Sequence, residues 1–395
     1  MNVFEDFKIS DLLKKSIKRH GFTKPTKIQY ISIPHIMEGK DVVGESATGS
    51  GKTLAFGCGI IDKVVPKAGL QALVMTPTRE LAEQVKMDLK KLSAEKPLLI
   101  ISIYGGVAIE PQMRDLRKAE VVVATPGRLL DHFSRGTIDT SKIKILVLDE
   151  ADRMLDMGFI DDVERIIKAC PKDRQTLLFS ATMLPQIKAL AARHMKDSTE
   201  VMAGRLVDPT KLTQVYYDVT GNLKLSLLIH LLQHERSGLV MVFCNSRINT
   251  DFLVKNLSKN GINAVAIHGG HSQNKRSSTM KEFNDAKMQV LVCTDVAARG
   301  LHIPNVSHIY NYDIPSDPND YVHRIGRTAR AGESGKVVNL LCDRDHDSFS
   351  RLMRDYSSFS IKKVERPNLK RVIAIRIQNP RRPQGRMSRR RPPYR

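Results

Sequence analysis

A glycine-rich loop that joins a strand to a helix constrains the fold of this chain most. The loop spans residues 46–53 and lies between the apolar pair Val42-Val43 and a helix-compatible segment that begins at Leu54. Small residues let backbone N–H groups close around phosphate oxygens, and the positive end of the following helix favours negative charge there. In such a loop Lys52 reaches the β and γ phosphates of a nucleotide, and Thr53 holds Mg²⁺. Eight residues are assigned to this site: Ser46, Ala47, Thr48, Gly49, Ser50, Gly51, Lys52 and Thr53.

The loop departs from the usual pattern at its first position. Phosphate loops of this kind have glycine five residues before Gly51, and this chain has Ser46 there. The alternative interpretation is a flexible glycine-rich surface loop, because short motifs also occur by chance. The intact Gly-Ser-Gly-Lys-Thr core at residues 49–53 favours a nucleotide site.

Length and charge narrow the class of protein. A chain of 395 residues exceeds what one core usually spans, which predicts two domains and an appendage. The net charge of +21 indicates a polyanionic partner, and nucleic acid is favoured over a membrane surface. No apolar run approaches the roughly 20 residues that span a bilayer, and the N-terminus lacks the order of a signal peptide. We expect a cytoplasmic protein whose five dispersed cysteines are core thiols.

A turn ahead of the phosphate loop is a candidate base-recognition element. Pro25 restricts Lys24 to extended conformations, so a fixed turn presents Gln29 at the start of the next helix. A glutamine amide donates and accepts, so Gln29 can pair with the N6 and N7 edge of adenine while Phe22 lies against the ring. A solvated glutamine is the simpler alternative for this residue taken alone.

Apolar runs then alternate with helix-length segments, as in a parallel sheet wound with helices. Buried strands are predicted at 72–75, 98–103, 121–124, 145–148 and 176–179. Ligands of open α/β sheets bind beyond the carboxyl ends of the strands. The residues at these exits are candidates for phosphate contacts, although each is also ordinary turn chemistry: Pro77, Thr78, Arg79, Gly105, Gly106, Thr125, Pro126, Gly127, Arg128, Ser180 and Thr182.

Three carboxylates follow the strand at 145–148 directly. Asp149, Glu150 and Asp152 are costly at the end of a buried strand unless a cation is present. Asp149 is placed to hold Mg²⁺ through water beside Thr53, and Glu150 to orient and deprotonate the attacking water. We expect Asp152 to face the hydroxyl groups of Ser180 and Thr182. The alternative is an acidic helix start that the helix dipole stabilises.

Taken together, these segments resemble the DEAD-box RNA helicases. The resemblance runs from Phe4 to about residue 357 and rests on the order of its motifs: Gln29, Gly51-Lys52-Thr53, Pro77 to Leu81, Thr125 to Arg128, Asp149 to Asp152, and Ser180 to Thr182. It implies two RecA-like α/β domains and ATP as the substrate. It also implies that Gln29 reads adenine, that the segments from Pro77 and Thr125 grip the RNA backbone, and that Ser180 and Thr182 couple hydrolysis to strand separation.

A linker near residues 203–212 precedes a second α/β pattern. Strands are predicted at 214–217, 239–244, 264–267, 290–293, 308–310 and 337–341, with no second phosphate loop. This half is therefore expected to complete a site in the first. Arg327 and Arg330 share one face if their segment is helical, and guanidinium groups stabilise charge on a transferring phosphoryl group. A solvated basic stripe is the alternative.

The resemblance assigns further residues in this half and meets two departures. It implies nucleotide contacts from Gly300 and His302, arginine fingers from Arg327 and Arg330, and RNA-side or coupling roles for Gln273, Arg276, Thr294, Arg299 and His323. His302 stands where the family has aspartate, and an imidazole cannot accept two ribose hydroxyl bonds as a carboxylate can. We therefore expect weaker nucleotide affinity or closure. Ala329 replaces a usual glycine, which is tolerable unless positive φ is required.

The last thirty residues are strongly basic. From Arg366 onward the chain has eleven basic residues and no acidic one, which accounts for 11 of the +21. Prolines at 380, 383, 392 and 393 prevent helix, so residues 380–395 are expected to be disordered, with one short strand around the isoleucines at 373, 375 and 377. The tail is either a sequence-independent RNA tether or a solubilising segment.

The sequence thus predicts an α/β protein of two tandem RecA-like domains with mainly parallel sheets. The expected parts are an ATP-binding domain over 1–205 with its adenine-reading segment at 4–29, a second helicase domain over 206–360, and a basic tail over 361–395. The expected activity is ATP-dependent RNA unwinding or remodelling by a monomer that uses ATP and Mg²⁺. An ATP-gated RNA clamp and a DNA-directed motor are the alternatives.

Overall fold

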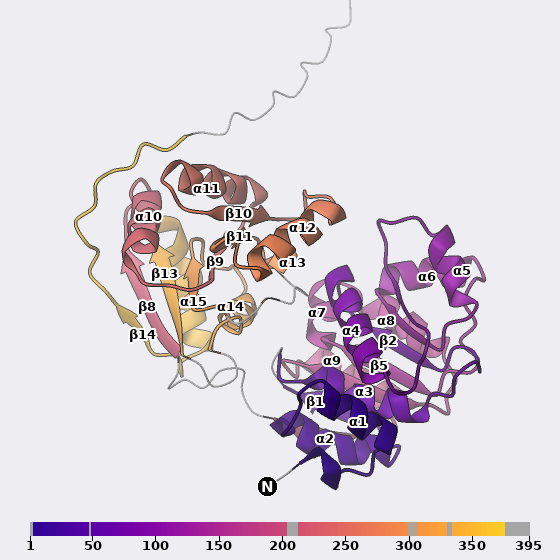
Figure 1. The fold of residues 1–395 in the computed structure, drawn as a ribbon. Helices are drawn as coiled ribbons and strands as arrows, with labels where there is room; N and C mark the ends of the chain where they lie inside the picture. Colours follow the sequence, from indigo (N-terminus) through magenta and orange to yellow (C-terminus); the bar gives the residue numbers. More distant parts are fainter. Residues whose placement is uncertain are drawn as a thin grey trace, which may run out of the picture.

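The fold consists of two parallel sheets, each wound with helices (Figure 1). A computed structural model describes residues 3–46, 49–203, 212–298, 303, 306–329 and 334–375. Within them the strands form two sheets of seven, and every recorded pairing is parallel. The predicted fold class is confirmed.

The first sheet has the strand order β3-β4-β2-β5-β6-β1-β7. Its strands are β1 Val42–Glu45, β2 Ala72–Met75, β3 Ile100–Ile103, β4 Val121–Ala124, β5 Ile145–Asp149, β6 Gln175–Ser180 and β7 Thr199–Met202. Its helices are α1 Asp11–Arg19, α2 Lys27–Met37, α3 Lys52–Lys63, α4 Arg79–Leu92, α5 Glu110–Leu116, α6 Pro126–Ser134, α7 Ala151–Asp156, α8 Ile160–Lys168 and α9 Pro185–His194, with a 3-10 turn at Phe4–Asp6.

Helices cover both faces of this sheet because its strands are apolar on both sides. In β2, Ala72 and Val74 pack into a cluster with α1 to α4, whereas Leu73 and Met75 pack into a second cluster with α6 to α9. Such a doubly covered parallel sheet collects its functional loops at the carboxyl ends of its strands.

The second sheet repeats this plan with the order β10-β11-β9-β12-β13-β8-β14. Its strands are β8 Leu212–Asp218, β9 Val240–Phe243, β10 Ala264–Ile267, β11 Val290–Cys293, β12 His308–Asn311, β13 Gly335–Leu341 and β14 Ile361–Lys363. Its helices are α10 Lys224–His234, α11 Arg247–Lys259, α12 Gln273–Asn284, α13 Asp295–Ala298, α14 Pro318–Ile325 and α15 His346–Asp355, with a 3-10 turn at Asp343–Asp345.

Two strands differ from the prediction. The edge strand β7 was not predicted, and the short C-terminal strand is β14 at Ile361–Lys363, while Ile373 and Ile375 lie outside any strand. Both omitted strands are short edge strands, β7 with only Val201 buried and β14 with no residue buried, so they carry no continuous apolar run. The prediction around residue 377 lies partly outside the described residues, as do most of the expected linker and residues 380–395.

Two further sequence expectations concern the side-chain environment. All five cysteines are buried and free, as expected of core thiols. Among the helices of the described part of the chain, none combines the length and apolar character that a membrane crossing requires.

Candidate nucleotide and RNA site

The phosphate loop is held in shape by Gly51 and Lys52 at the start of α3. Gly51 has φ 95°, and a Cβ atom there would stand 2.2 Å from Nε2 of Gln29, so this position requires glycine. Lys52 is buried, and its Nζ donates to the Ser46 carbonyl at 3.1 Å. The Ser46 and Ser50 hydroxyls share a hydrogen bond of 2.9 Å. The loop thus holds a buried ammonium group beside a helix start, which fits a phosphate group; Ala47 and Thr48 lie outside the described residues.

Gln29 links the turn before α2 to the phosphate loop. Its Oε1 accepts from the Thr26 N–H at 2.9 Å, and its Nε2 donates to the Gly51 carbonyl at 3.0 Å. An amide group has two N–H donors and two acceptor lone pairs, so one of each is still available for a base edge. Phe22 is 48% exposed, so its ring is accessible to a planar ligand.

The carboxylates of Asp149 and Glu150 lie buried where β5 ends. Glu150 has φ 53° and caps α7, and its backbone N–H donates to Oδ1 of Asp149 at 3.0 Å. Burial raises the pKa of Asp149 to about 6; the ammonium of Lys52 lowers this pKa, whereas the carboxylate of Glu150 raises it. These buried carboxylates lie beside the Lys52 ammonium and beside Arg153, whose Nε is 3.4 Å from Oε2 of Glu150. Carboxylate oxygens are the ligands that Mg²⁺ prefers. Asp149, whose neighbouring cation is the Lys52 ammonium rather than a guanidinium group, is therefore the candidate ligand.

Asp152 ties α7 to the turn after β6. Its Oδ2 accepts from the backbone N–H groups of Ala181 and Thr182 at 3.1 and 3.0 Å, and from the Thr182 hydroxyl at 3.2 Å. The Ser180 hydroxyl accepts from the Asp152 N–H at 3.2 Å and donates to the Thr182 carbonyl at 2.8 Å. The expected proximity of Asp152 to Ser180 and Thr182 is therefore present in the structure.

His323 of α14 brings the second domain to this carboxylate. Its Nε2 lies 3.8 Å from Oδ2 of Asp152, and both side chains are buried. Burial would raise the pKa of Asp152, but the contact with His323 and the charges of Lys52 and Arg153 hold it well below its usual range. The ionised Asp152 thus forms a link between the two domains.

Arg327 follows α14 and is buried at the same boundary. It lines a small cavity together with Arg153 of the first domain and with Asp295, His323 and Arg324 of the second. Its guanidinium therefore belongs to the boundary between the domains, where a finger residue would be expected. Arg330, Arg299, Gly300 and His302 lie outside the described residues.

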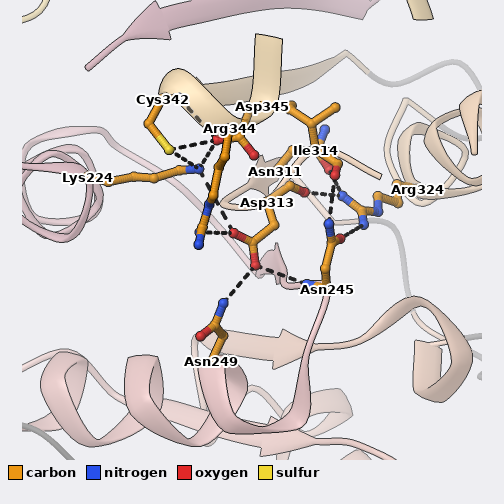
Figure 2. A network of polar contacts seen from close by, with 10 residues as sticks. All are labelled: Lys224, Asn245, Asn249, Asn311, Asp313, Ile314, Arg324, Cys342, Arg344 and Asp345. Carbon is orange, nitrogen blue, oxygen red and sulfur yellow. Dashed lines mark hydrogen bonds and ion pairs between the residues drawn. The ribbon is translucent and has the colours of Figure 1, made fainter. Parts of the chain in front are cut away.

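A network of polar side chains in the second domain holds Arg324 of α14 in place (Figure 2). Arg324 pairs with both oxygens of Asp295 at 2.6 Å each, and it donates to the side chains of Asn245 and Asn311 and to the Asp313 carbonyl. The Asp313 carboxylate accepts in turn from the Asn249 amide and from Arg344. Sequence reasoning missed Arg324 and Asp295, although each is adjacent to a predicted residue, His323 and Thr294 respectively.

On the first domain, the predicted RNA loops converge around Arg79. Thr78 caps α4 by accepting from the Leu81 N–H at 3.3 Å. The Arg79 guanidinium packs against Gly106, where a Cβ atom would stand 2.1 Å from Nη1, and it lies 3.9 Å from a Cβ built at Gly105. The ends of three strands are joined here, because the Thr76 N–H after β2 donates to the Ala124 carbonyl of β4 and the Thr125 N–H before α6 donates to the Ile103 carbonyl of β3, each at 2.9 Å.

Arg128 makes more protein contacts than its predicted role suggested. Its guanidinium donates to Oε1 of Gln112 at 3.1 Å and to the Val107 carbonyl at 2.9 Å, and its Nε lies 3.8 Å from Asp131. These bonds connect α6 to the loop that contains Gly105 and Gly106. Arg128 is therefore placed to position that loop.

Gln273 and Arg276 of α12 contact the first domain. Both donate to Oε1 of Glu80, at 3.2 Å from Gln273 Nε2 and 3.0 Å from Arg276 Nη1. Arg276 also donates to the Ala297 carbonyl at 3.3 Å, which joins α12 to α13. Thr294 accepts through its carbonyl from the N–H groups of Ala297 and Ala298 and so begins α13. The sequence did not single out Glu80, which lies one residue after Arg79.

The loop before α12 is braced by a hydrogen-bonded histidine. Nδ1 of His268 accepts from the Gly270 N–H at 3.1 Å, which requires the proton to be on Nε2, and Nε2 donates to Asp251 at 3.0 Å. His271 lies against this ring with a centroid distance of 3.9 Å. The side chains of Asp251, His268 and His271 thus stabilise this loop. With Nδ1 of His268 accepting from Gly270 and Nε2 donating to Asp251, His268 has no lone pair available for a metal ion.

The tandem sheets and this site define a RecA-like ATPase with its nucleotide site at a domain boundary. The family model described as DEAD/DEAH box helicase matches residues 26–190, and the model described as Helicase conserved C-terminal domain matches residues 223–332. The ATP-dependent RNA helicase CshA of Limosilactobacillus reuteri is 45% identical over 347 residues, which cover 87% of this chain and 70% of that protein. The corresponding protein of Bacillus subtilis is 41% identical, covering 94% and 75%. The chain belongs to the DEAD-box family of ATP-dependent RNA helicases.

Solved structures support the two-domain fold. Dbp5 of S. cerevisiae bound to RNA and ADP BeF3 superimposes with a TM-score of 0.84 at 29% identity, covering 92% of this chain and 96% of that one. A DEAD box protein of Methanococcus jannaschii is 39% identical with 92% and 99% coverage, yet its TM-score is 0.57. This chain therefore superimposes more closely on the Dbp5 structure than on the Methanococcus jannaschii one.

Proposed function

We propose that this chain binds RNA across its two domains and couples ATP hydrolysis to local duplex separation or RNA–protein remodelling. Its membership of the ATP-dependent RNA helicase family gives the activity. The observation that carries the proposal is the buried Asp152, which contacts the Ser180–Thr182 turn on one side and His323 on the other. One residue thereby joins the carboxylates of the nucleotide site to the second domain.

We assign the nucleotide-site roles by chemistry. Lys52 and the loop N–H groups bind the β and γ phosphates of ATP, and Gln29 and Phe22 take the adenine. Thr53 and Asp149, the latter through water, hold Mg²⁺, which supplies charge neutralisation at the β and γ phosphates when bound. Glu150 orients the attacking water and accepts its proton. Arg327 and Arg330 stabilise the negative charge on the transferring phosphoryl group, while Gly300 and His302 contact the nucleotide.

RNA is the polyanion that fits the remaining residues. The Arg79 side chain and the N–H groups at Gly105, Gly106 and the start of α6 contact the backbone from the first domain. From the second domain, Thr294 and Arg299 contact the RNA backbone. Gln273 and Arg276 contact it where the two domains meet. The basic residues from 376 to 395 add a sequence-independent RNA contact, since clustered arginines gain affinity by counterion release.

The domain limits, the cellular location and the oligomeric state of the protein are part of the same proposal. We divide the chain into 1–205, 206–360 and 361–395. One sheet on either side of the first limit supports that limit, whereas β14 at Ile361–Lys363 pairs with β8 and so extends the second sheet past residue 360. We place the protein in the cytoplasm and treat it as a monomer. The net charge of +21 supports RNA as its main partner.

The decisive experiment measures ATP hydrolysis with and without single-stranded RNA, on the intact chain and on Glu150→Gln. Stimulation by RNA and not by matched DNA, with loss in the variant, is the expected result. Equal stimulation by DNA would replace the assignment with a general nucleic-acid motor. Duplex release is measured in parallel, because an ATP-gated clamp hydrolyses ATP without releasing strands; the helicase relatives favour release.

A further inference from the structure

A buried arginine lies one helical turn after Glu150. Arg153 is the third residue of α7, and its side chain is 2% exposed. Its Nε lies 3.4 Å from Oε2 of Glu150, whose side chain is buried as well. Residues three apart in a helical turn lie on the same side, so the sequence spacing favours this ion pair. The pair joins the proposed general base to a guanidinium group that the roles assigned above leave unused.

The backbone fixes the positions of both residues. Glu150 has φ 53°, and its carbonyl accepts from the Arg153 N–H at 3.0 Å. The same N–H donates to Oδ1 of Asp152 at 3.1 Å. Arg153 is thereby tied to the residue that also contacts the Ser180–Thr182 turn and His323. Its side chain therefore starts from a defined point, from which it can orient the Glu150 carboxylate.

One nitrogen atom of the guanidinium group lacks a hydrogen bond. Nη1 of Arg153 is buried and has no hydrogen-bond partner within the described parts of the chain. A buried charge is costly unless it is paired, so Arg153 depends on a carboxylate close by. The contact of its Nε supplies that carboxylate at Glu150. The burial of Arg153 and the orientation of Glu150 thus depend on each other.

The second domain covers another side of this guanidinium group. A cavity of about 10 Å³ separates Arg153 from second-domain residues that include Asp295, Asp320 and Arg327. Such a volume has room for about one water molecule, so bulk water does not reach Arg153 from this side. In Figure 1, α7 lies on the side of the first domain that faces α13 and α14. The contact between the domains therefore contributes to the burial of Arg153.

The exclusion of water strengthens the ion pair of Arg153 and Glu150. The attraction between opposite charges increases as the effective dielectric constant falls, and water competes less for the guanidinium N–H groups. Asp295 lines the same cavity but already pairs with Arg324 through both of its oxygens. An ionised carboxylate has about four acceptor sites, so the contact at Oε2 does not exclude water from Glu150.

We propose that Arg153 is a positioning residue for ATP hydrolysis, which holds the Glu150 carboxylate toward the attacking water while the second domain covers the guanidinium group. The inference rests on the proposed role of Glu150 as the general base. Separation of the domains returns water to Arg153 and weakens the pair, so Glu150 is held best when the domains are in contact. Because Arg153 acts through Glu150, its loss slows hydrolysis and leaves the binding of ATP and RNA in place.

The test compares Arg153→Gln with Arg153→Lys in the full chain. Glutamine removes the charge, whereas lysine keeps the charge without the guanidinium fork. Arg165→Gln is the matched control, because Arg165 of α8 makes an ion pair of the same spacing with Asp162 at 3.7 Å, but its side chain is 69% exposed.

Three quantities are measured for each variant. They are the rate of ATP hydrolysis at saturating ATP and RNA, the RNA concentration that gives half of this rate, and the affinity for a fluorescent ATP analogue without RNA. Thermal unfolding reports whether each variant is folded. Arg153→Met is the second uncharged variant should glutamine impair folding.

We expect Arg153→Gln to lower the maximal rate about tenfold or more, because a general base contributes about 10²–10⁴-fold and loses its orientation here. Nucleotide affinity and the half-saturating RNA concentration should change by less than about twofold, since the lost interaction acts on the hydrolysis step. Arg153→Lys should recover part of the rate, and Arg165→Gln should match the wild type.

A wild-type maximal rate in Arg153→Gln, with hydrolysis lost in Glu150→Gln, would overturn the positioning role and leave Glu150 as the base. Losses of the same size in rate and in nucleotide or RNA affinity would overturn it too, because they would indicate general damage to the site. A rate as low in Arg153→Lys as in Arg153→Gln would exclude the ion pair as its basis. If Glu150→Gln itself keeps RNA-stimulated hydrolysis, the proposed role of Glu150 is refuted instead.

Discussion

Two non-glycine residues in segments of the candidate nucleotide site have left-handed backbone. Glu150 has φ 53° and Ala329 has φ 53°, a region that L-residues adopt only at a cost. At Glu150 this conformation turns the chain from β5 into α7 and places the carboxylate next to Asp149. Strain of this kind is concentrated at functional sites, where the surrounding structure imposes it. Ala329 meets the condition under which alanine in place of glycine is unfavourable.

Ala329→Gly is expected to stabilise the second domain slightly. Glycine adopts a positive φ without strain, which stabilises the folded state, whereas the greater freedom of glycine in the unfolded chain and the loss of the buried methyl group both destabilise it. We expect the first effect to be the larger, with a net gain of about 0.5 kcal/mol in the free energy of unfolding. Ala286 has φ 55° and is exposed, so Ala286→Gly should gain about 1 kcal/mol. Urea unfolding measures both. A loss of stability in Ala329→Gly alone would mean that its methyl packing outweighs the strain.

The buried pair of Lys224 and Asp345 anchors the network in Figure 2. Burial would raise the pKa of Asp345, yet hydrogen bonds from Lys224 and the Cys342 thiol lower it below 3.8. The folded pKa is thus below the unfolded one. The pair therefore stabilises the fold above about pH 4 and loses this contribution as the pH falls through the folded pKa.

Asp345→Asn is expected to destabilise the second domain by about 3 kcal/mol near neutral pH, because it leaves a buried ammonium without its main partner. The variant should also lose the part of the acid sensitivity that this carboxylate gives the wild type below about pH 4. Asp343→Asn, two residues away and exposed, is the control. Unfolding curves at several pH values check this; equal acid sensitivity in both variants would contradict it.

At the scale of elements, loops set the RNA side of the first domain. Gly106 has φ 79°, and a Cβ atom there would lie 2.1 Å from Nη1 of Arg79. A Cβ atom at Gly105 would lie 3.9 Å from the same guanidinium group. Gly106→Ala is therefore expected to displace Arg79 and to weaken RNA affinity, with a stability cost of about 1 kcal/mol from the positive φ.

Gly105→Ala supplies the matched control for that loop, since its methyl group would meet Arg79 Nη2 only at an ordinary van der Waals distance of 3.9 Å. Fluorescence anisotropy with labelled RNA compares the two variants. Similar affinities would show that Arg79 adjusts without losing its RNA contact. The substitutions are adjacent and chemically identical, so the comparison separates the combined effect of the Arg79 collision and the positive φ at Gly106 from that of an added methyl group in this loop.

Much of the element order could be predicted from the sequence because buried parallel strands are continuous apolar runs. The strands at 121–124, 264–267 and 290–293 match their predicted bounds. β7 and β14 could not be found this way because their exposed residues break the run. In the site, adjacent motifs identified Lys52 and Asp152, whereas the role of Glu80 depends on contacts with Gln273 and Arg276, more than one hundred positions away. Such contacts leave no local pattern.

At the scale of the whole molecule, two polar contacts between described residues join the domains. His323 with Asp152 lies at the nucleotide side, and Gln273 and Arg276 with Glu80 lie at the proposed RNA side. Each contact contains a residue that would also face a ligand. Binding of ATP or RNA can therefore favour this arrangement by adding to a contact that already exists between the domains.

Glu80→Ala distinguishes two roles of Gln273 and Arg276. If they mainly close the domains, the variant should lose about tenfold in RNA-stimulated ATP hydrolysis below saturating RNA, because hydrogen bonds to charged groups contribute about 1.5–3 kcal/mol. Nucleotide affinity without RNA should be unchanged, since Glu80 lies outside the phosphate loop. Glu83→Ala is the control, because Glu83 pairs with Lys86 and Ser102 within the first domain. Tighter RNA binding with undiminished hydrolysis would mean that Glu80 competes with RNA for Gln273 and Arg276. Domain closure would then depend on the contact between His323 and Asp152.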